Sequence, residues 1–510
     1  MGAELVRALL RLVAVFLAFD LLSQAALAQV MYRIKPLGYL GTCTSVPRAY
    51  GFNASDQVTG SACNSHGDTH AFLWKNNGTA MIDLGPSQVG SSSIGYGINA
   101  SGLVAGSATD STGDYGFTSS GGSMTKIPNG FGGTGTYAYA LNDLGQVTGE
   151  APNAPPEFTT DAFVWKNGSG MIDLGGNSTG LPNTYGVAIN AKGQVAGSQF
   201  DGDRSTNPFV WLNNGTPTIF LGGQGEVQGS CCINASGQVA GTISISGYAH
   251  PNAFYWRNDG TGMHALGALP GGDLSEATGQ NDSGWITGGS IVGYFKKTIA
   301  FVWMNNGKPM KSLGTLGGTN SEGDDINAGG EVTGWSNTSG VSNNHAFLWR
   351  NDGTPMQDLN KLIDPMDPLQ PFVTLYEGYF ISVLGDILAG GTDSRTGNQD
   401  LYLLQGTVLT LNPRALAFGN QAIKTSSAAK SVTMTNTSPK AVAIASITLA
   451  GSGASQFVST NNCGHSLVGK GTCTIKVTFK PTTKGAKSAT LSVNGGGNGL
   501  RVVTLTGTGT

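Results

Sequence analysis

The chain has 510 residues, of which 12% are charged and 79 are glycine. This length exceeds one ordinary hydrophobic core and predicts a large repeat domain with a smaller domain beside it. Low charge with abundant Gly, Ser, Thr and Asn indicates a secreted all-β protein with many turns. Regularly spaced Trp, Phe, Ile and Val exclude disorder as the main reading, because they supply core material.

Charge is distributed unevenly along the chain. Residues 409–510 contain ten Lys and Arg and no Asp or Glu, and residues 1–28 are neutral. The net charge of -3 therefore leaves -3 - 10 = -13 on residues 29–408. Such opposite charges could attract the two parts to each other or to different surfaces, but solubility alone is the interpretation that we prefer.

The first 28 residues resemble a signal peptide. Arg7 and Arg11 flank the start of an apolar run from Leu12 to Phe19, and Ala26-Leu27-Ala28 is a small-x-small cleavage site. We expect secretion to the cell surface, periplasm or medium after cleavage near Ala28. The apolar run is far short of the roughly 20 residues that span a bilayer, so no membrane anchor is expected in the mature chain.

Six cysteines in an exported chain favour disulfides. We predict two local bridges, Cys43 with Cys63 and Cys463 with Cys473. Cys231 and Cys232 are adjacent. They could be two small buried side chains, or they could form a strained vicinal disulfide, and the sequence leaves both alternatives open.

One nine-residue pattern, Ile-Asn-x-x-Gly-x-Val-x-Gly, recurs about every 46 residues, which is the period of a repeat built from one small sheet. Asparagine and glycine at these places indicate a tight turn between two strands. The asparagines of the copies are Asn53, Asn99, Asn142, Asn190, Asn234, Asn281 and Asn327, and a degenerate eighth copy has Ser382.

Each unit contains four short strands. In the unit around Asn190 we expect them at 184–189, 194–198, 209–211 and 218–221. The third strand recurs as Ala-Phe-x-Trp, for example at 71–74, and its Phe and Trp share one face. Four strands in each of about eight units predict a β-propeller.

The ends of the repeat region indicate how such a ring would close. Residues 32–37 resemble a fourth strand that precedes the first full unit, so we expect this segment to complete the last blade. A linear β-solenoid is the alternative, and it would need capping ends. The weak second and eighth units leave seven blades with an irregular closure as an alternative count.

These repeats resemble the HAF-type extracellular repeat, named for His-Ala-Phe. His70-Ala71-Phe72 and His345-Ala346-Phe347 match the signature, and Asp-Leu-Gly and Ile-Asn-x-x-Gly follow in order over residues 31–408. The resemblance implies an exported bacterial protein and brings no catalytic residue. Because the His varies among copies, we interpret it as decoration of a strand edge.

Residues 409–510 break the period and read as an immunoglobulin-like β-sandwich. We expect strands at 431–436, 443–449, 473–481, 489–493 and 502–506. Asn412-Pro413 and the run from Cys473 to Pro481 resemble the ASH/hydin-type domain, whose bacterial copies are called choice-of-anchor D. The domains expected are thus a signal peptide (1–28), a propeller (29–408) and a sandwich (409–510).

No segment carries a readable catalytic, cofactor or metal motif. The letters of residues 176–180 match a nucleophile elbow and those of 464–470 a phosphate loop, but no helix follows either. Asp201 with Asp203, and Asp324 with Asp325, are too few carboxylates for a calcium cage. We therefore expect no catalytic residue, no cofactor and no metal site.

We expect a monomeric, non-enzymatic binding or structural scaffold, with an extracellular glycan or envelope component as partner and no nucleic acid. The alternative is a propeller hydrolase or lyase that acts on an extracellular glycan. Three or more convergent carboxylate, His or Tyr side chains in a central pocket would favour the enzyme.

Overall fold

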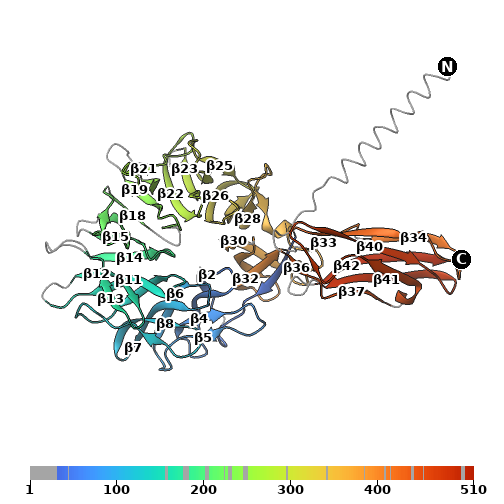
Figure 1. Ribbon diagram of the computed structural model, residues 1–510, viewed down its shortest axis with the longest axis horizontal. Coiled ribbons are helices and arrows are strands. Elements are labelled where there is room, and N and C mark those ends of the chain that lie inside the picture. The colour runs from blue at the N-terminus through green and yellow to red at the C-terminus, as the bar shows by residue number, and fades with distance from the viewer. Residues whose placement is uncertain are drawn as a thin grey trace, which may run out of the picture. The chain divides into compact units, whose positions relative to one another are not determined.

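The computed structural model describes residues 31–510 apart from 44, 156–158, 176–182, 201–205, 223, 228–231, 245–250, 294–296, 341–342, 384, 407–408, 414, 438–440, 452 and 495–499. The predicted signal peptide and its cleavage site lie outside these residues. The chain forms two compact units, one of Ile34–Gln405 and another that contains Gly406–Thr510 (Figure 1). In the described part of the chain, no helix is long and apolar enough to cross a membrane.

The larger unit is a β-propeller of eight four-stranded antiparallel sheets, as the repeats predict. We number them as blades one to eight. Blade one consists of β2 (Arg48–Phe52), β3 (Val58–Cys63), β4 (Thr69–Trp74) and β5 (Ile82–Asp83). Blade two consists of β6 (Ser92–Ile98), β7 (Val104–Asp110), β8 (Gly113–Ser119) and β9 (Thr125–Lys126). Blade three consists of β10 (Tyr137–Leu141), β11 (Gln146–Pro152), β12 (Thr160–Lys166) and β13 (Gly170–Asp173). Blade four consists of β14 (Thr184–Ile189), β15 (Val195–Phe200), β16 (Thr206–Trp211) and β17 (Ile219–Phe220). Blade five consists of β18 (Gln224–Glu226), β19 (Val239–Ser244), β20 (Asn252–Trp256) and β21 (Met263–Ala265). Blade six consists of β22 (Gly272–Gln280), β23 (Ile286–Val292), β24 (Lys297–Trp303) and β25 (Lys311–Gly314). Blade seven consists of β26 (Gly317–Ile326), β27 (Val332–Thr338), β28 (Asn344–Trp349) and β29 (Gln357–Asp358).

Blade eight closes the ring with strands from both ends of the repeat region. Its order is β1 (Tyr32–Pro36), β32 (Asn398–Gly406), β31 (Ile387–Asp393) and β30 (Val373–Ile381), preceded by the 3-10 turn η2 (Leu359–Lys361). The N–H of Leu37 donates to the carbonyl of Leu401 at 2.9 Å. The predicted closure by residues 32–37 is therefore confirmed, and the solenoid and the seven-blade count are both wrong.

Large apolar side chains fill the space between neighbouring sheets. The Phe of the third strand is fully buried in seven blades, and the two strands that flank it supply small residues and Val or Ile. These phenylalanines are Phe72, Phe117, Phe163, Phe209, Phe254, Phe301 and Phe347. A core shared between every pair of blades makes each sheet depend on its neighbours.

The asparagine of each turn also joins one blade to the next. In blade four, the Oδ1 of Asn190 accepts from the N–H groups of Lys192 and Gln194 and so holds the turn. Its Nδ2 donates to the carbonyl of Asn234, which is the same position in blade five. All seven asparagines make this interblade hydrogen bond, at 2.8 to 3.3 Å.

The smaller unit is a two-sheet sandwich. One sheet has the order β33 (Leu409–Asn412), β35 (Lys430–Asn436), β40 (Thr472–Phe479) and β38 (Phe457–Asn461); the other has β34 (Ala415–Gln421), β42 (Leu500–Gly509), β41 (Gly485–Asn494) and β37 (Ser446–Ala450). The short strands β36 (Val442–Ala443) and β39 (Ser466–Leu467) pair separately, and η3 (Ala454–Gln456) precedes β38.

Both predicted disulfides are present, one in each unit. Cys43 is joined to Cys63 before the second turn of blade one, and Cys463 is joined to Cys473 across the sandwich loop. Cys232 is a small buried side chain, as one of the two alternatives for this pair expects. Cys231 lies outside the described residues.

Candidate binding site in the centre of the ring

The first strand of a blade carries a β-bulge just before its asparagine turn. The register shifts at this place in seven of the eight first strands, among the residues described. A bulge leaves one residue unpaired and changes the direction of its side chain. The bulged residues, three positions before the turn residue, are Tyr50, Tyr96, Tyr139, Val187, Thr278, Asp324 and Tyr379.

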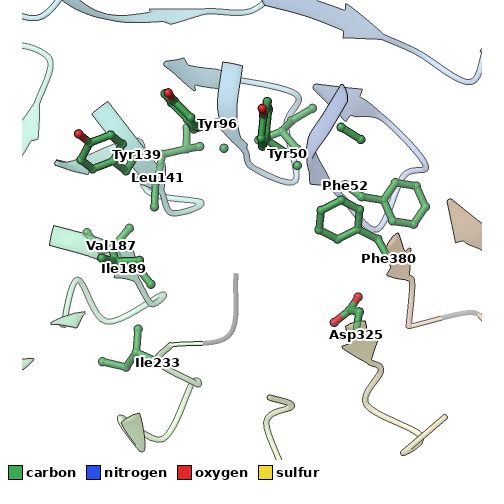
Figure 2. A pocket seen from close by; sticks show the side chains of 16 residues that line it. Tyr50, Phe52, Tyr96, Tyr139, Leu141, Val187, Ile189, Ile233, Asp325 and Phe380 are labelled. Carbon is green, nitrogen blue, oxygen red and sulfur yellow. The ribbon is translucent and has the colours of Figure 1, made fainter. Parts of the chain in front are cut away.

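The first strands surround a cavity of about 670 Å³ (Figure 2). Tyr50, Tyr96 and Tyr139 follow one another along one wall, and successive ring centroids are 5.6 Å apart. Asp325 projects from the opposite side of the opening, beside Phe380. The remaining wall is apolar, so a few polar groups converge on a space the size of a small ligand.

This cavity meets the criterion set from the sequence, since three tyrosines and one carboxylate converge in it. By that criterion the finding counts against the non-enzymatic scaffold and favours the enzyme alternative. It indicates a working site in the centre of the ring.

Both oxygens of the Asp325 carboxylate accept hydrogen bonds from backbone N–H groups. One oxygen accepts from the N–H of Ile381 at 2.9 Å and the other from the N–H of Ile326 at 2.8 Å. Burial raises the pKa of Asp325 to about 6, and these two hydrogen bonds oppose part of that rise. Asp325 thus links blades seven and eight and presents a polar edge to the cavity.

A second layer of carboxylates lies one step further along the same strands. Glu276, Glu322 and Glu377 each stand five positions before the turn residue, in blades six, seven and eight. Burial raises the pKa of Glu322, and repulsion from Glu276 and Glu377 raises it further. The indole of Trp335 donates to Glu322.

Asp324 lies between the two layers, at the bulge of blade seven. It shares a hydrogen bond with Glu377, and the phenol of Tyr379 donates to the same glutamate. Burial and the neighbouring carboxylates raise the pKa of Asp324 well above its usual value. Its Oδ2 is buried without a hydrogen-bond partner among the described residues.

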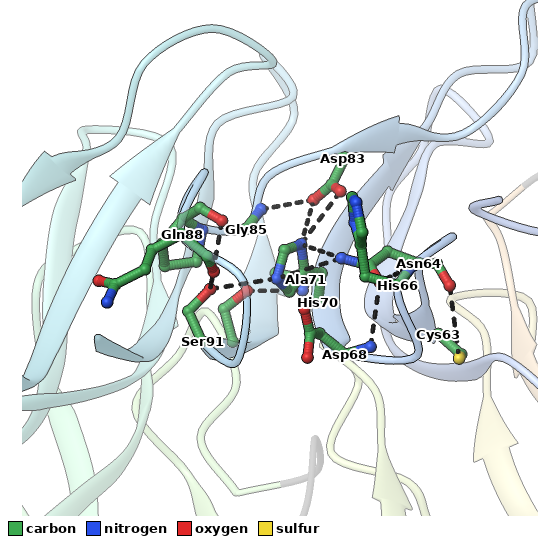
Figure 3. Close-up of polar contacts among 12 residues, drawn as sticks. Cys63, Asn64, His66, Asp68, His70, Ala71, Asp83, Gly85, Gln88 and Ser91 are labelled. Carbon is green, nitrogen blue, oxygen red and sulfur yellow. Dashed lines mark hydrogen bonds and ion pairs between the residues drawn. The ribbon is translucent and has the colours of Figure 1, made fainter. Parts of the chain in front are cut away.

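His70, in the first copy of the repeat signature, is a buried residue, so its interpretation as strand-edge decoration is wrong for this copy (Figure 3). His70 is 4% exposed, and its Nδ1 lies 2.9 Å from a carboxylate oxygen of Asp83 on the fourth strand. Burial raises the pKa of Asp83, but the hydrogen bonds from His70 and from the N–H of Gly85 bring it below its usual value. His345 makes the same contact with Asp358 at 3.0 Å.

Ser91 completes an arrangement that looks like a hydrolase triad. Its Oγ lies 3.3 Å from Nε2 of His70 (Figure 3). However, the hydroxyl donates to the carbonyl of Gln88 at 2.6 Å, and Ser91 is only 4% exposed. A nucleophile needs access to substrate and a base that accepts its proton. These residues therefore hold the loop between blades one and two.

The motifs dismissed from the sequence gain no support. Residues 176–180 and the pair Asp201 and Asp203 lie outside the described residues. The segment 464–470 contains the short strand β39 and is followed by the disulfide-bonded Cys473. Among the described residues, no three His, Cys, Asp or Glu side chains form a group that could hold a metal ion.

Comparison with known proteins identifies the smaller unit. Residues 407–500 match the family model of the ASH domain, described as "Abnormal spindle-like microcephaly-assoc'd, ASPM-SPD-2-Hydin". The C-terminal part of the chain is an ASH domain. The ASH / PapD-like domain of human CEP192 is similar to it, with 15% identity over 20% of this chain and 86% of that chain and a TM-score of 0.16.

The larger unit is similar to solved structures only at low identity. The β-propeller domain of the Trilobed protease from Pyrococcus furiosus is 12% identical over 66% of this chain and all of that one, with a TM-score of 0.39. TolB from Acinetobacter baumannii is 15% identical over 51% of this chain and 64% of that one, with a TM-score of 0.29. No curated protein sequence matches the chain. None of these likenesses assigns an activity to the propeller.

Sequence reasoning missed the cavity residues because they match no known motif. A signal was nevertheless present. Once the repeats are aligned on the turn residue, the third position before it is Tyr in four units and varies in the others, whereas the fourth position before it is Gly, Ala or Ser in every unit. The second position before it is small in six units and is Asp325 or Phe380 in the other two. Variation concentrated in two adjacent columns of an otherwise uniform repeat is typical of a binding surface.

Proposed function

We propose that this chain is an exported bacterial protein of the HAF-repeat type whose propeller binds an extracellular glycan or cell-envelope component in its central cavity, without transforming it. The tyrosine wall of Tyr50, Tyr96 and Tyr139 is the observation that carries this proposal. Tyrosine combines an apolar ring face with a polar hydroxyl, so it can pack on a sugar ring and also bond to its hydroxyl groups. The phenol of Tyr139 donates to Glu150 at 2.6 Å, which holds that ring in place.

The size and polarity of the cavity support a ligand of a few sugar rings. Its volume of about 670 Å³ falls within the range of ordinary small-molecule sites. Asp325 adds a carboxylate that can accept from hydroxyl groups at the opposite side.

A glycan hydrolase or lyase is the second candidate, favoured by the convergence of polar groups and by the pKa of Asp325 near 6. A glycoside hydrolase ordinarily uses two carboxylates, one on each side of the bond that it cleaves. Asp325 is the sole carboxylate among the described residues that line the cavity, and both of its oxygens already accept from backbone N–H groups. We therefore place binding ahead of catalysis.

A glycan array, probed with the mature chain and with a Tyr96→Ala variant, tests the proposal. We expect selective binding by the wild type and a loss of about 10-fold or more in the variant, since a stacked aromatic side chain contributes on the order of 1–3 kcal/mol. Phe220→Ala is the matched control, because Phe220 is a partly exposed aromatic residue on the outer strand β17. Binding that is equal in all three proteins, or absent, refutes the proposal.

Incubation of each bound glycan with the protein, followed by mass spectrometry, separates binding from catalysis. We expect intact glycans. Shortened or unsaturated products that depend on Asp325 would establish the enzyme instead.

Export is tested separately by expressing the full chain in a bacterium and sequencing the N-terminus of the exported form. We expect Gln29 as the first residue. An uncleaved chain that stays in the cytoplasm would contradict the proposed location.

A further inference from the structure

A second cavity lies in blade seven, at the ends of β26 and β27 that are away from the Asn327 turn. Its walls are the start of β26 (317–320), the end of β27 and Asn344 at the start of β28. It shares no lining residue with the central cavity. Its volume of about 680 Å³ falls within the range of ordinary small-molecule sites. We call this cavity the blade-seven hollow.

The blade-seven hollow arises from an irregular start of β26. Between two regular pairs of the ladder, the three residues 318–320 of β26 lie opposite Asn337 alone. This is the largest bulge in the first strands, among the residues described. Gly318 permits it, because a Cβ there would lie 2.5 Å from the Cβ of Asn337. Bulges change the direction of side chains and are common next to active sites.

Trp335 gives the hollow an aromatic wall that the other blades lack. It occupies a position of the second strand that is Ser, Thr, Gly or Glu in the other seven blades. The side chain is partly exposed, and its indole N–H donates to Glu322, which holds the ring in place. Since seven blades fold without an aromatic residue here, the repeat does not need Trp335 for its core. The ring is therefore available to a ligand.

Polar side chains along the hollow form one chain of hydrogen bonds. Nδ2 of Asn320 donates to Oγ1 of Thr319 at 3.3 Å, and this hydroxyl donates to Oδ1 of Asn337 at 3.4 Å. Nδ2 of Asn337 donates to Oδ1 of Asn344 at 2.7 Å. Asn344 is exposed, and its own Nδ2 donates to no other residue in the described part of the chain. The chain thus ends in an oriented amide that can donate to a ligand.

The lining of the hollow favours a neutral, hydroxylated ligand. None of the described residues that line it has a charged side chain, so a charged ligand would lose hydration without gaining a counter-charge. Amide groups donate and accept hydrogen bonds, as hydroxyl groups do, and an indole packs on the apolar face of a sugar ring. A peptide fits less well, because β27 is paired on both sides and cannot accept a further strand.

We propose that the blade-seven hollow is a second binding site, which takes a neutral sugar whose ring packs on Trp335 and whose hydroxyl groups bond to Asn344. This inference goes beyond the proposed function, because it does not depend on a ligand in the central cavity.

Fluorine NMR of the mature chain labelled with 5-fluorotryptophan tests the second site. The chain has eight tryptophans, and Trp335→Phe identifies the signal of Trp335. The probes are the neutral disaccharides cellobiose, maltose and lactose, with digalacturonic acid and the neutral peptide N-acetyl-triglycine amide for comparison. We expect at least one neutral disaccharide to shift the Trp335 signal until it saturates. The acidic disaccharide and the peptide should leave that signal unchanged.

Asn344→Asp tests the polar contact. The carboxylate keeps the acceptor for Asn337 and removes the donor that faces the ligand. We expect the affinity for the sugar to fall about 3- to 10-fold, the usual range for one neutral hydrogen bond. Asn306→Asp is the matched control, since it places the same charge on an exposed turn of blade six and should bind as the wild type does.

Tyr96→Ala separates the two sites. It alters the central cavity, and we expect it to leave the response of the Trp335 signal unchanged, because the two cavities share no lining residue. Loss of the response in this variant would place the sugar in the central cavity and overturn the second site.

Three further results would overturn the second site and leave the proposed function to the glycan array. The first is a Trp335 signal that none of the three neutral disaccharides shifts. The second is equal affinity of the wild type and Asn344→Asp. The third is a response to the acidic disaccharide or to the peptide that is as strong as the response to the neutral sugar.

Discussion

At the scale of single residues, the turn asparagine explains why one short pattern persists through seven units. Its Oδ1 closes the turn within its own blade, and its Nδ2 bonds to the next blade. Asn190 is 6% exposed, so neither bond can be replaced by water without cost. The pattern Ile-Asn-x-x-Gly is thus a joint between blades as well as a turn.

Asn190→Asp should separate these two roles, because the carboxylate keeps the acceptor and loses the donor. The new charge would face the carbonyl of Asn234, and we expect a loss of about 2–4 kcal/mol in the free energy of unfolding. Asn214→Asp is the control: its Oδ1 accepts from Thr216 in an exposed outer turn. Equal stability of the two variants in urea denaturation would contradict the interblade role.

Gly193 occupies the turn position that requires a left-handed backbone, with φ of 75°. A Cβ here would lie 2.8 Å from Asn213 and from Gln146. We expect Gly193→Val to cost about 1–3 kcal/mol, and the exposed neighbour Lys192→Val to cost much less. Thermal melts of the two variants check this, and matching shifts would mean that the turn does not need glycine.

At the scale of elements, β1 joins the start of the repeat region to its end. Tyr32, Ile34 and Leu37 are buried, and the N–H groups of Ile34 and Gly38 donate to Asp367 and Asp400. The segment therefore serves as the outer strand of blade eight.

Deletion of residues 29–38 should open the ring. Three buried side chains are lost, at about 1.5–3 kcal/mol each, and the exposed edge of β32 can pair with another chain. We expect a lower melting temperature and association in sedimentation experiments. A truncated chain that stays monomeric and melts unchanged would show that β1 does not close the propeller.

Asp400 makes the stability of the contact between β1 and β32 depend on pH. Burial raises the pKa of Asp400 to about 7, although it accepts from the N–H groups of Leu401 and Gly38. Between about pH 4 and pH 7, the carboxyl of Asp400 is protonated in the folded state and ionised in the unfolded chain. The contribution of the protonated carboxyl to the free energy of unfolding is therefore fully present below about pH 4 and is lost as the pH rises to about 7.

Asp400→Asn resembles the protonated acid at every pH. We expect the fall in unfolding free energy between pH 4 and pH 8 to be about 1–3 kcal/mol smaller in this variant than in the wild type. Denaturation at several pH values measures the difference. Parallel profiles for the two proteins would contradict the buried carboxyl as the cause.

At the scale of the whole molecule, the eight blades could be predicted because each repeats the same local signals. The Ala-Phe-x-Trp strand, the asparagine turn and the spare strand at 32–37 are all readable in order along the chain. The ASH domain was equally readable, from the run between Cys473 and Pro481.

The central cavity could not be predicted, since it arises only when the ring closes. Tyr96 and Asp325 come from blades two and seven, so no local motif contains both. The direction of Tyr96 also depends on a bulge, which shifts the strand register at that residue. The buried His70 was misread for a related reason: its partner Asp83 lies on another strand.

A crystal structure of the mature chain with the glycan that binds most tightly on the array tests the central claim most directly. We predict an intact glycan in the cavity, with a sugar ring against Tyr96 and polar contacts toward Asp325. A ligand bound only outside the ring of first strands, or found cleaved within it, would contradict the cavity as a non-catalytic binding site.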